Sequence, residues 1–146
     1  MDDEDTGAPA GGANPTTGDM LRDIFARQAE LGQFYRQMRP EGFYGLPPLE
    51  KCTTWTRAII HECCELDDEL GWKPWKNAPD REANRAARLE ETADILHFVV
   101  ELALCQGFSA DELYAAYVRK NAANRERQRI DPRYRAVSAA ETETDA

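Results

Sequence analysis

The sequence predicts an all-α protein folded as a helical bundle of about four main helices. Between residues 19 and 135 the apolar side chains recur at intervals of three and four, which is the period of an amphipathic helix, and no segment shows the alternation of a strand. Glycine, proline and capping residues separate four such segments. At 146 residues the chain has room for one domain.

The first two helices are expected at about 19–38 and 49–70. The first carries an apolar stripe that includes Ile24 and Phe25 and ends before Pro40. The second carries a stripe that includes Trp55 and stops at Gly71, a residue type that commonly follows a helix. A loop with two tryptophans and two lysines comes next.

The last two helices are predicted from their caps. Asp80 is a candidate N-cap for a third helix that extends to Gln106 and is closed by a glycine. Ser109 and Glu112 have the spacing of a capping box and predict a fourth helix to about Gln128. A proline at position 132 is expected to end the ordered part of the chain.

The net charge of -9 belongs mostly to the two ends of the chain. Residues 1–18 and 136–146 carry seven of the 27 acids and none of the 18 Lys and Arg residues. Both segments are predicted to be disordered acidic tails around one domain at 19–135. The nearly neutral domain lacks the concentrated positive charge with which proteins bind nucleic-acid polymers, so we expect no such partner.

No targeting or membrane segment is evident in the sequence. No stretch approaches the roughly 20 apolar residues of a membrane span, and the first residues lack the basic and apolar regions of a signal peptide. We therefore expect a soluble cytoplasmic protein. The four cysteines form no Cys-x-x-Cys pair, and three of them, Cys63, Cys64 and Cys105, lie in apolar helical runs, so small core-filling residues are favoured over a disulfide or zinc site.

Two pairs of acids are candidates for a metal site. On the second predicted helix, Glu62 and Glu65 share one face at the edge of the apolar stripe. On the third, Glu91 and Asp94 are one turn apart, and the helix around Asp94 is apolar over nearly its whole circumference, so we expect it to be largely buried. Buried carboxylates need compensation, and oxygen ligands suit Mg²⁺ or Mn²⁺.

An ordinary structural role for these acids remains open at this point. Spacing alone is equally compatible with ion pairs between the four carboxylates and the arginines of neighbouring turns, Arg57, Arg85 or Arg88. A shared proton between two carboxylates is a further solution. The residues therefore predict a converging acidic cluster and leave its use undecided.

Three segments together carry a resemblance to a known family. They are Glu62-x-x-Glu65-Leu66-x-Asp68, Trp72-Lys73-Pro74-Trp75-Lys76, and Glu91-x-x-Asp94-Ile95-Leu96-His97-Phe98. This pattern resembles the all-α dimeric dUTP pyrophosphatases, which belong to the MazG-like pyrophosphohydrolases. The similarity continues in the fourth helix and covers roughly residues 20–128, with Tyr117, Lys120, Asn121, Asn124, Arg127 and Gln128 at family positions.

The resemblance implies a Mg²⁺-dependent hydrolase that cleaves dUTP to dUMP and pyrophosphate. Mn²⁺ is a possible substitute for Mg²⁺. Glu62, Glu65, Glu91 and Asp94 would hold the metal, with Glu62 also the catalytic base. Gln28 and Trp55 would contact the base. The phosphates or the sugar would be contacted by Lys73, Lys76, Lys120, Asn121, Asn124 and Arg127.

Two alternatives remain beside dUTP hydrolysis. Relatives usually carry an asparagine shortly after the glutamine of the first helix, whereas Gln28 is followed by Ala-Glu-Leu-Gly, so the same reaction on dGTP or dCTP stays open. A second alternative is a non-enzymatic helical module whose acidic ridge binds proteins. Because four helices of this size leave apolar faces uncovered, a homodimer or homotetramer is expected.

Overall fold

The chain forms four α-helices and two short 3-10 turns over the residues that the structure describes. This computed structural model describes residues 19–77, 80 and 82–134, so both predicted acidic tails lie outside it. The elements follow in the order α1 (Met20–Met38), η1 (Gly42–Gly45), α2 (Pro48–Leu70), α3 (Arg85–Cys105), α4 (Ala110–Ile130) and η2 (Pro132–Tyr134). The described residues include no strand, which confirms the all-α prediction.

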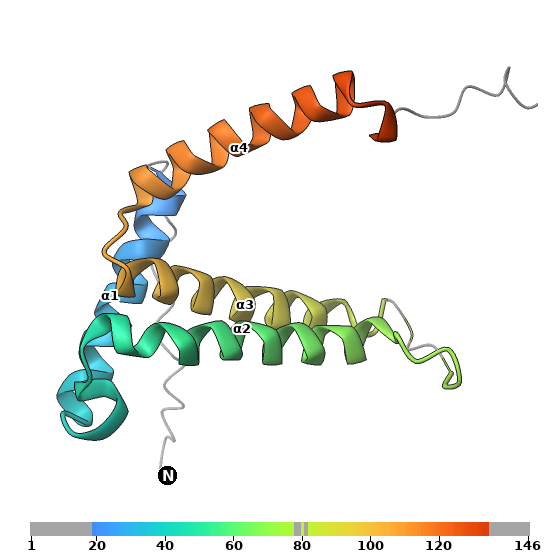
Figure 1. Ribbon diagram of the computed structural model, residues 1–146. Coiled ribbons are helices and arrows are strands. Elements are labelled where there is room, and N and C mark those ends of the chain that lie inside the picture. The colour runs from blue at the N-terminus through green and yellow to red at the C-terminus, as the bar shows by residue number, and fades with distance from the viewer. Residues whose placement is uncertain (1–18, 78–79, 81, 135–146) are drawn as a thin grey trace, which may run out of the picture.

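The central unit is an antiparallel pair formed by α2 and α3, with α1 packed across it (Figure 1). The small core lies where α1 meets the end of α3 and the beginning of α4. Its most buried member is Val100, which is 1% exposed. Phe25, Ala103 and Ala110 complete the buried cluster, and Leu21, Ile24, Leu104 and Leu113 pack against it.

Caps set the ends of most helices as the sequence predicted. The Asp19 side chain accepts a hydrogen bond from the backbone of Arg22 at the start of α1. Gly71 follows α2 with φ +71° and Gly107 follows α3 with φ +79°, a conformation that glycine adopts without strain. At the start of α4 the Ser109 hydroxyl accepts from the backbone N–H of Glu112, and the Glu112 carboxylate accepts in return.

The predicted start of the third helix was wrong. Asp80 does not cap α3, which begins at Arg85 after Asn84. The Asp80 carboxylate instead accepts hydrogen bonds from the backbone N–H groups of Glu82 and Ala83, at 3.0 and 3.3 Å. Short acidic side chains favour such local turns over helix, so Asp80 ends up one turn ahead of the helix. At the other end of the chain, Pro132 opens η2 rather than ending the order.

The third helix is also less buried in the single chain than its apolar circumference predicted. Leu89 is 61% exposed and Leu96 is 42% exposed, because among the described residues α2 and α1 provide most of the cover on α3 and leave part of its surface open. Cys63 and Cys64 on α2 are exposed, which contradicts their prediction as core residues, whereas Cys105 is buried. All four cysteines are free thiols, as expected.

The fourth helix departs from the rest of the molecule. It meets α3 at a bend of 110° and packs mainly on α1, where Arg22 pairs with Asp111 at 2.6 Å (Figure 1). Among the described residues no single helix is long and apolar enough to cross a membrane, and α3 and α4 reach that length and apolarity only when taken together across their bend. Beyond Ala110 and Leu113, the side chains of α4 are exposed.

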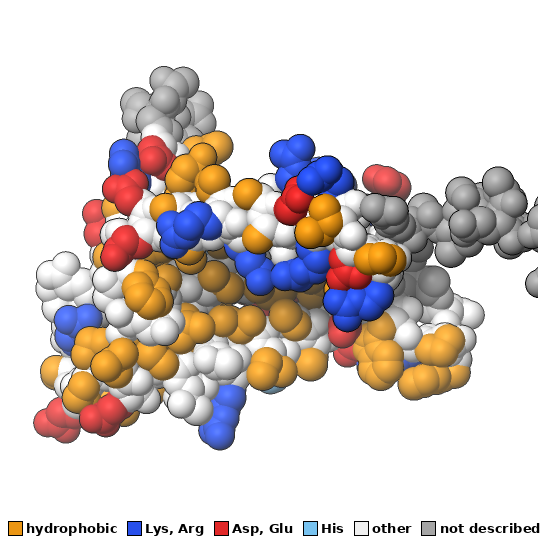
Figure 2. All heavy atoms as spheres, turned by 45° about the horizontal axis from the view of Figure 1, so that its top comes forward, with side chains coloured by type: hydrophobic (Ala, Val, Ile, Leu, Met, Phe, Trp, Pro, Cys, Tyr) orange, Lys and Arg blue, Asp and Glu red, His pale blue; other side chains and the backbone are white. Residues whose placement is uncertain are grey.

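A large apolar area remains exposed on the single chain. Figure 2 shows hydrophobic side chains spread over one face, with Lys and Arg side chains gathered nearby. Among the described residues, exposed large hydrophobic side chains include Ile60 on α2, Leu89 on α3, and Tyr114 and Tyr117 on α4. Contiguous apolar surface of this kind is typical of a face that another protein surface covers.

We therefore expect the protein to assemble as a homodimer or homotetramer. Burying the exposed apolar side chains of two or more copies against each other removes them from water, which favours association. Light scattering should give a mass of two or four times 16.5 kDa. A single mass of one chain throughout the micromolar concentration range would contradict this expectation.

Candidate active site

Three carboxylates from α2 and α3 meet between the two antiparallel helices. Glu62 lies on α2, and Glu91 and Asp94 lie one turn apart on α3. One oxygen of each lies within 4.8 Å of an oxygen of each of the others, and all three residues are half-buried. The helix spacing of three residues aims both α3 carboxylates at the same turn of α2.

The Glu91 carboxylate has an oxygen without a partner. Its Oε2 atom is buried and makes no hydrogen bond. Burial raises the pKa of Glu91, and the negative charges of Glu65, Glu62 and Asp94 raise it further. Burial also raises the pKa of Glu62, with added contributions from Glu65 and Asp94. The cluster therefore holds excess negative charge and an oxygen with an open lone pair.

Two of the three arginines on neighbouring turns, Arg57 and Arg85, form no ion pair with this cluster among the residues that the structure describes. The donor set is entirely carboxylate oxygen, which suits a hard cation such as Mg²⁺ or Mn²⁺. The Glu91 Oε2 atom keeps a lone pair that no described residue uses.

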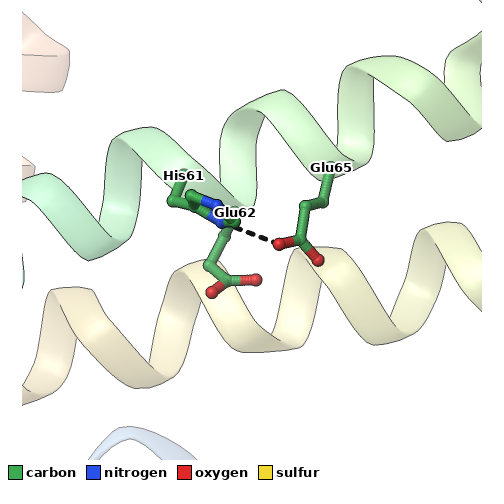
Figure 3. A group of neighbouring side chains, drawn as sticks. All are labelled: His61, Glu62 and Glu65. Atoms are coloured by element: carbon green, nitrogen blue, oxygen red, sulfur yellow. Dashed lines mark ion pairs between the residues drawn. The ribbon is translucent and has the colours of Figure 1, made fainter.

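Glu65 lies at the edge of this cluster and faces a histidine. Figure 3 shows His61 and Glu62 together on one turn of α2 and Glu65 on the next turn, with an ion pair between His61 and Glu65. The His61 Nδ1 atom and a Glu65 oxygen are 2.7 Å apart, and both side chains are largely exposed. Glu65 nevertheless acts on the pKa values of Glu62 and Glu91, so its charge reaches the cluster.

A cavity of about 300 Å³ adjoins the carboxylates, since Asp94 is part of its wall. This volume is at the lower end of the range for small-molecule sites. Aromatic rings form much of the wall: Trp55 stacks on Phe98 with 5.7 Å between ring centroids, and Tyr35 stacks on Tyr44 at 5.2 Å. The Trp55 indole N–H donates to the Cys105 sulfur at 3.2 Å, which fixes the indole in the wall.

Gln28 also lines this cavity and is held at both ends of its amide. Its Nε2 atom donates to the Glu101 carboxylate at 3.0 Å, and its Oε1 atom lies 2.8 Å from Nδ1 of His97. The second Nε2 hydrogen is left over for another acceptor. Gln28 and Trp55, the two residues predicted to contact a base, are thus both in the wall of one cavity beside the carboxylates.

The two loop lysines lie at the far end of α2. The Lys73 ammonium pairs with Asp68 at 2.5 Å, and the Trp72 indole N–H donates to the same carboxylate at 2.9 Å. Hydrogen bonds from Lys73 and Trp72 lower the pKa of Asp68. Lys73 and Lys76 border one shallow hollow there.

The structure does not bring the predicted α4 residues to the carboxylates of the same chain. They are exposed on the part of α4 that runs away from α2 and α3 (Figure 1). These four residues are Lys120, Asn121, Asn124 and Arg127.

Two polar residues of the cavity carried no predicted role in the sequence. Lys51 is buried and lies one turn before Trp55 on α2. Glu101 lies two turns after Asp94 on α3 and holds Gln28. Lys51 lies four residues before Trp55, and Glu101 lies seven residues after Asp94, so each shares a helix face with a predicted site residue. This spacing was the signal in the sequence that could have identified both residues.

The fold and the cluster together define an all-α protein with a half-buried carboxylate cluster beside an aromatic-walled cavity. The model of the family described as dUTPase matches residues 20–106, and the chain belongs to this family. The match spans α1, α2 and α3 and ends before α4. Neither a curated protein nor a solved structure matches the chain. Family membership makes the protein a hydrolase that acts on a nucleotide.

The raised pKa values of Glu62 and Glu91 predict how the metal-free protein responds to pH. A carboxylate whose pKa is higher in the folded chain than in the unfolded chain adds stability at low pH and loses that contribution as the pH rises through the raised value. The free energy of unfolding should therefore increase as the pH falls from 7 toward the ordinary glutamate value of 4.5. Urea unfolding with a chelator present measures it.

The variant Glu91→Gln supplies the comparison. It removes one charge from the cluster, so at pH 7 the metal-free variant should be more stable than the natural protein and its stability should change less with pH. Asp67→Asn, on the exposed side of α2, is the matched control and should leave the pH response unchanged. A natural protein whose stability is flat between pH 7 and 5 would contradict the expectation.

Proposed function

We propose that the protein is a Mg²⁺-dependent pyrophosphohydrolase that converts dUTP and water to dUMP and pyrophosphate, as a cytoplasmic enzyme. The observation that supports it most is the trio of Glu62, Glu91 and Asp94, with its unpartnered Glu91 oxygen, at the edge of the aromatic-walled cavity. Membership in the dUTPase family supports the same reaction. Mn²⁺ would be accepted in place of Mg²⁺.

The four acids are proposed to hold the metal, with Glu65 turning from His61 to join the trio. A bound Mg²⁺ would neutralise the charge of the triphosphate oxygens. Glu62 is the proposed general base: it orients a water molecule and takes its proton as the water oxygen bonds to the α phosphorus. The bond from that phosphorus to the bridging oxygen breaks, and pyrophosphate leaves. Burial of Glu62 keeps its carboxylate basic, which suits this role.

The nucleoside is proposed to occupy the cavity beside Asp94, with its base near Gln28 and Trp55. The Trp55 ring is stacked on Phe98 and lines the cavity, so the base would meet it at the cavity wall. Lys73 and Lys76 are proposed contacts of the phosphates. The α4 residues Lys120, Asn121, Asn124 and Arg127 would reach phosphate or sugar only in an assembly that brings α4 over a set of carboxylates.

Removing any one of the four acids should abolish most of the activity while leaving the fold intact. We expect Glu62→Ala, Glu65→Ala, Glu91→Ala and Asp94→Ala each to lower kcat/KM by about two orders of magnitude or more, because each loses part of the metal site. Asp67→Ala is the control and should stay close to the natural protein. Circular dichroism checks the fold, and the rate of pyrophosphate release measures the activity.

Thermal unfolding with Mg²⁺ and a non-hydrolysable dUTP analogue separates this enzyme from a protein-binding module. Ligand at a hundredfold excess over Kd should add about 2.7 kcal/mol to the free energy of unfolding. An Asp94→Ala protein that is active with unchanged Mg²⁺ dependence would overturn the metal assignment, and a natural protein without any shift would favour the module.

The substrate preference is tested with the common nucleoside triphosphates and dUTP, with the products separated by chromatography. We expect pyrophosphate release from dUTP at least about tenfold faster than from dCTP, dGTP or TTP, because a mismatched base edge leaves a buried polar group unpaired. Gln28→Ala should lower kcat/KM for dUTP and narrow this preference while metal binding remains. Preference for dGTP or dCTP would overturn the substrate alone, whereas release of single phosphate would overturn the reaction.

A further inference from the structure

Lys51 is a buried lysine for which the described residues provide no partner. Its side chain is 5% exposed, and its ammonium makes no hydrogen bond or ion pair with any residue that the structure describes. It also lies in the first turn of α2, which begins at Pro48, where the backbone dipole of the helix disfavours a positive charge. The position at the start of α2 therefore disfavours the charge of Lys51, while its nitrogen is not closed off and opens onto the cavities that the side chain lines.

The position of Lys51 suggests what compensates for this. It lines the 300 Å³ cavity beside Asp94 and also a second cavity of about 210 Å³. Both cavities share Gln28, Gly32 and Glu101 with it, so Lys51 lies where the two meet. A ligand bound in the first cavity would therefore contact the Lys51 ammonium at the end of that cavity that adjoins the second one.

Lys51 and the carboxylate trio lie at opposite ends of one helix face. Lys51, Trp55 and Glu62 are four and seven residues apart, which keeps them on the same side of α2. The eleven residues from Lys51 to Glu62 span about 16 Å along the axis at about 1.5 Å per residue. A nucleotide whose phosphates lie at Glu62 and Asp94 thus has its base directed toward Lys51.

The charges around Lys51 favour a neutral polar group over a second anion. Glu101 lines both cavities with Lys51, so the two side chains nearly cancel in net charge. The Glu101 carboxylate is already engaged by Gln28 at 3.0 Å, and it is not within ion-pair distance of Lys51. The ammonium therefore remains free to donate to an uncharged oxygen such as a carbonyl.

Resting on the function proposed above, we propose that Lys51 determines base specificity by donating a hydrogen bond to a carbonyl oxygen of the nucleobase, O4 in uracil. Uracil and thymine carry this acceptor, and cytosine carries an amino group in the same position. An amino group opposite the ammonium places two donors against each other and leaves both unpaired in a buried site. Lys51 thus selects for keto pyrimidines and against cytosine, and it does not distinguish uracil from thymine.

The test compares Lys51→Met with Arg36→Met in the full-length protein. Arg36 is exposed and lines the second cavity, so its variant removes the same charge from the same end of the site while Lys51 stays in place. Two measurements are made: kcat/KM for dUTP, TTP and dCTP, and the Kd values of dUMP and dCMP by calorimetry. Thermal unfolding of the nucleotide-free proteins accompanies them.

In Lys51→Met we expect kcat/KM for dUTP to fall by about tenfold to a hundredfold, the usual value of a hydrogen bond from a charged donor. The value for dCTP should not fall by more than about twofold, and it should rise where the clash of two donors is relieved. The ratio of dUTP to TTP should stay constant, and dUMP should lose affinity relative to dCMP. The nucleotide-free variant should be at least as stable as the natural protein. Arg36→Met should keep the natural preference.

An equal loss for dUTP and dCTP, or an unchanged preference for dUTP over dCTP, overturns the proposal. So does loss of folding in both Lys51→Met and Lys51→Gln, which would make Lys51 a structural residue. A variant with altered mass in light scattering and unaltered base preference overturns it too, because Lys51 would then face a second copy. If the natural protein hydrolyses no nucleotide, the proposed function fails, while the comparison of dUMP with dCMP still decides the role of Lys51.

Discussion

The contact between α2 and α3 holds together carboxylates that repel one another. Glu62 faces Glu91 and Asp94 across the helix pair, and an oxygen of Glu91 is buried without a partner. Apolar packing of the two helices must outweigh this repulsion in the metal-free chain. The same antiparallel register places Trp55 against Phe98 one to two turns away, so the aromatic wall of the cavity and the acidic cluster are positioned by a single interface.

The other helices depend less on this interface and are held by local features. The beginning of α4 is fixed by its capping box and by the pair of Arg22 with Asp111, and beyond Leu113 its side chains are exposed. The protein thus combines a tightly packed pair of helices, α2 and α3, with a fourth helix whose side chains beyond Leu113 are not covered by the single chain. Apolar side chains such as Tyr117 on that helix are the part of the structure that the single chain explains least.

Much of the fold was predictable because its signals are local. Three-residue and four-residue periodicity gave the helices, and glycines with positive φ and the Ser109 capping box gave most of their ends. The start of α3 was predicted too early at Asp80, because an aspartate side chain accepts hydrogen bonds from the backbone of a turn as readily as from the first turn of a helix. The exposure of Cys63, Cys64 and Leu89 was not predictable, since an apolar helix face does not say whether its cover comes from the same chain.

The candidate site shows the same division between local and long-range information. Helix spacing and family resemblance identified the four acids, and the structure places three of them within reach of one ion. The contact between Glu65 and His61 was not predictable from the sequence, because a histidine four residues before a glutamate on a helix can turn toward the carboxylate or away from it. Glu101 and Lys51 were missed because each is a single polar residue whose one signal was its helical spacing from Asp94 or Trp55.

One hydrogen-bond chain in the cavity has a fixed polarity. An ionised carboxylate can only accept hydrogen bonds, so the Gln28 amide turns its nitrogen toward Glu101 and its oxygen toward His97. His97 must then carry its hydrogen on Nδ1, which leaves the Nε2 lone pair of the neutral imidazole unused in this chain of bonds. A single negative charge on α3 therefore decides the tautomer of a ring one helical turn away.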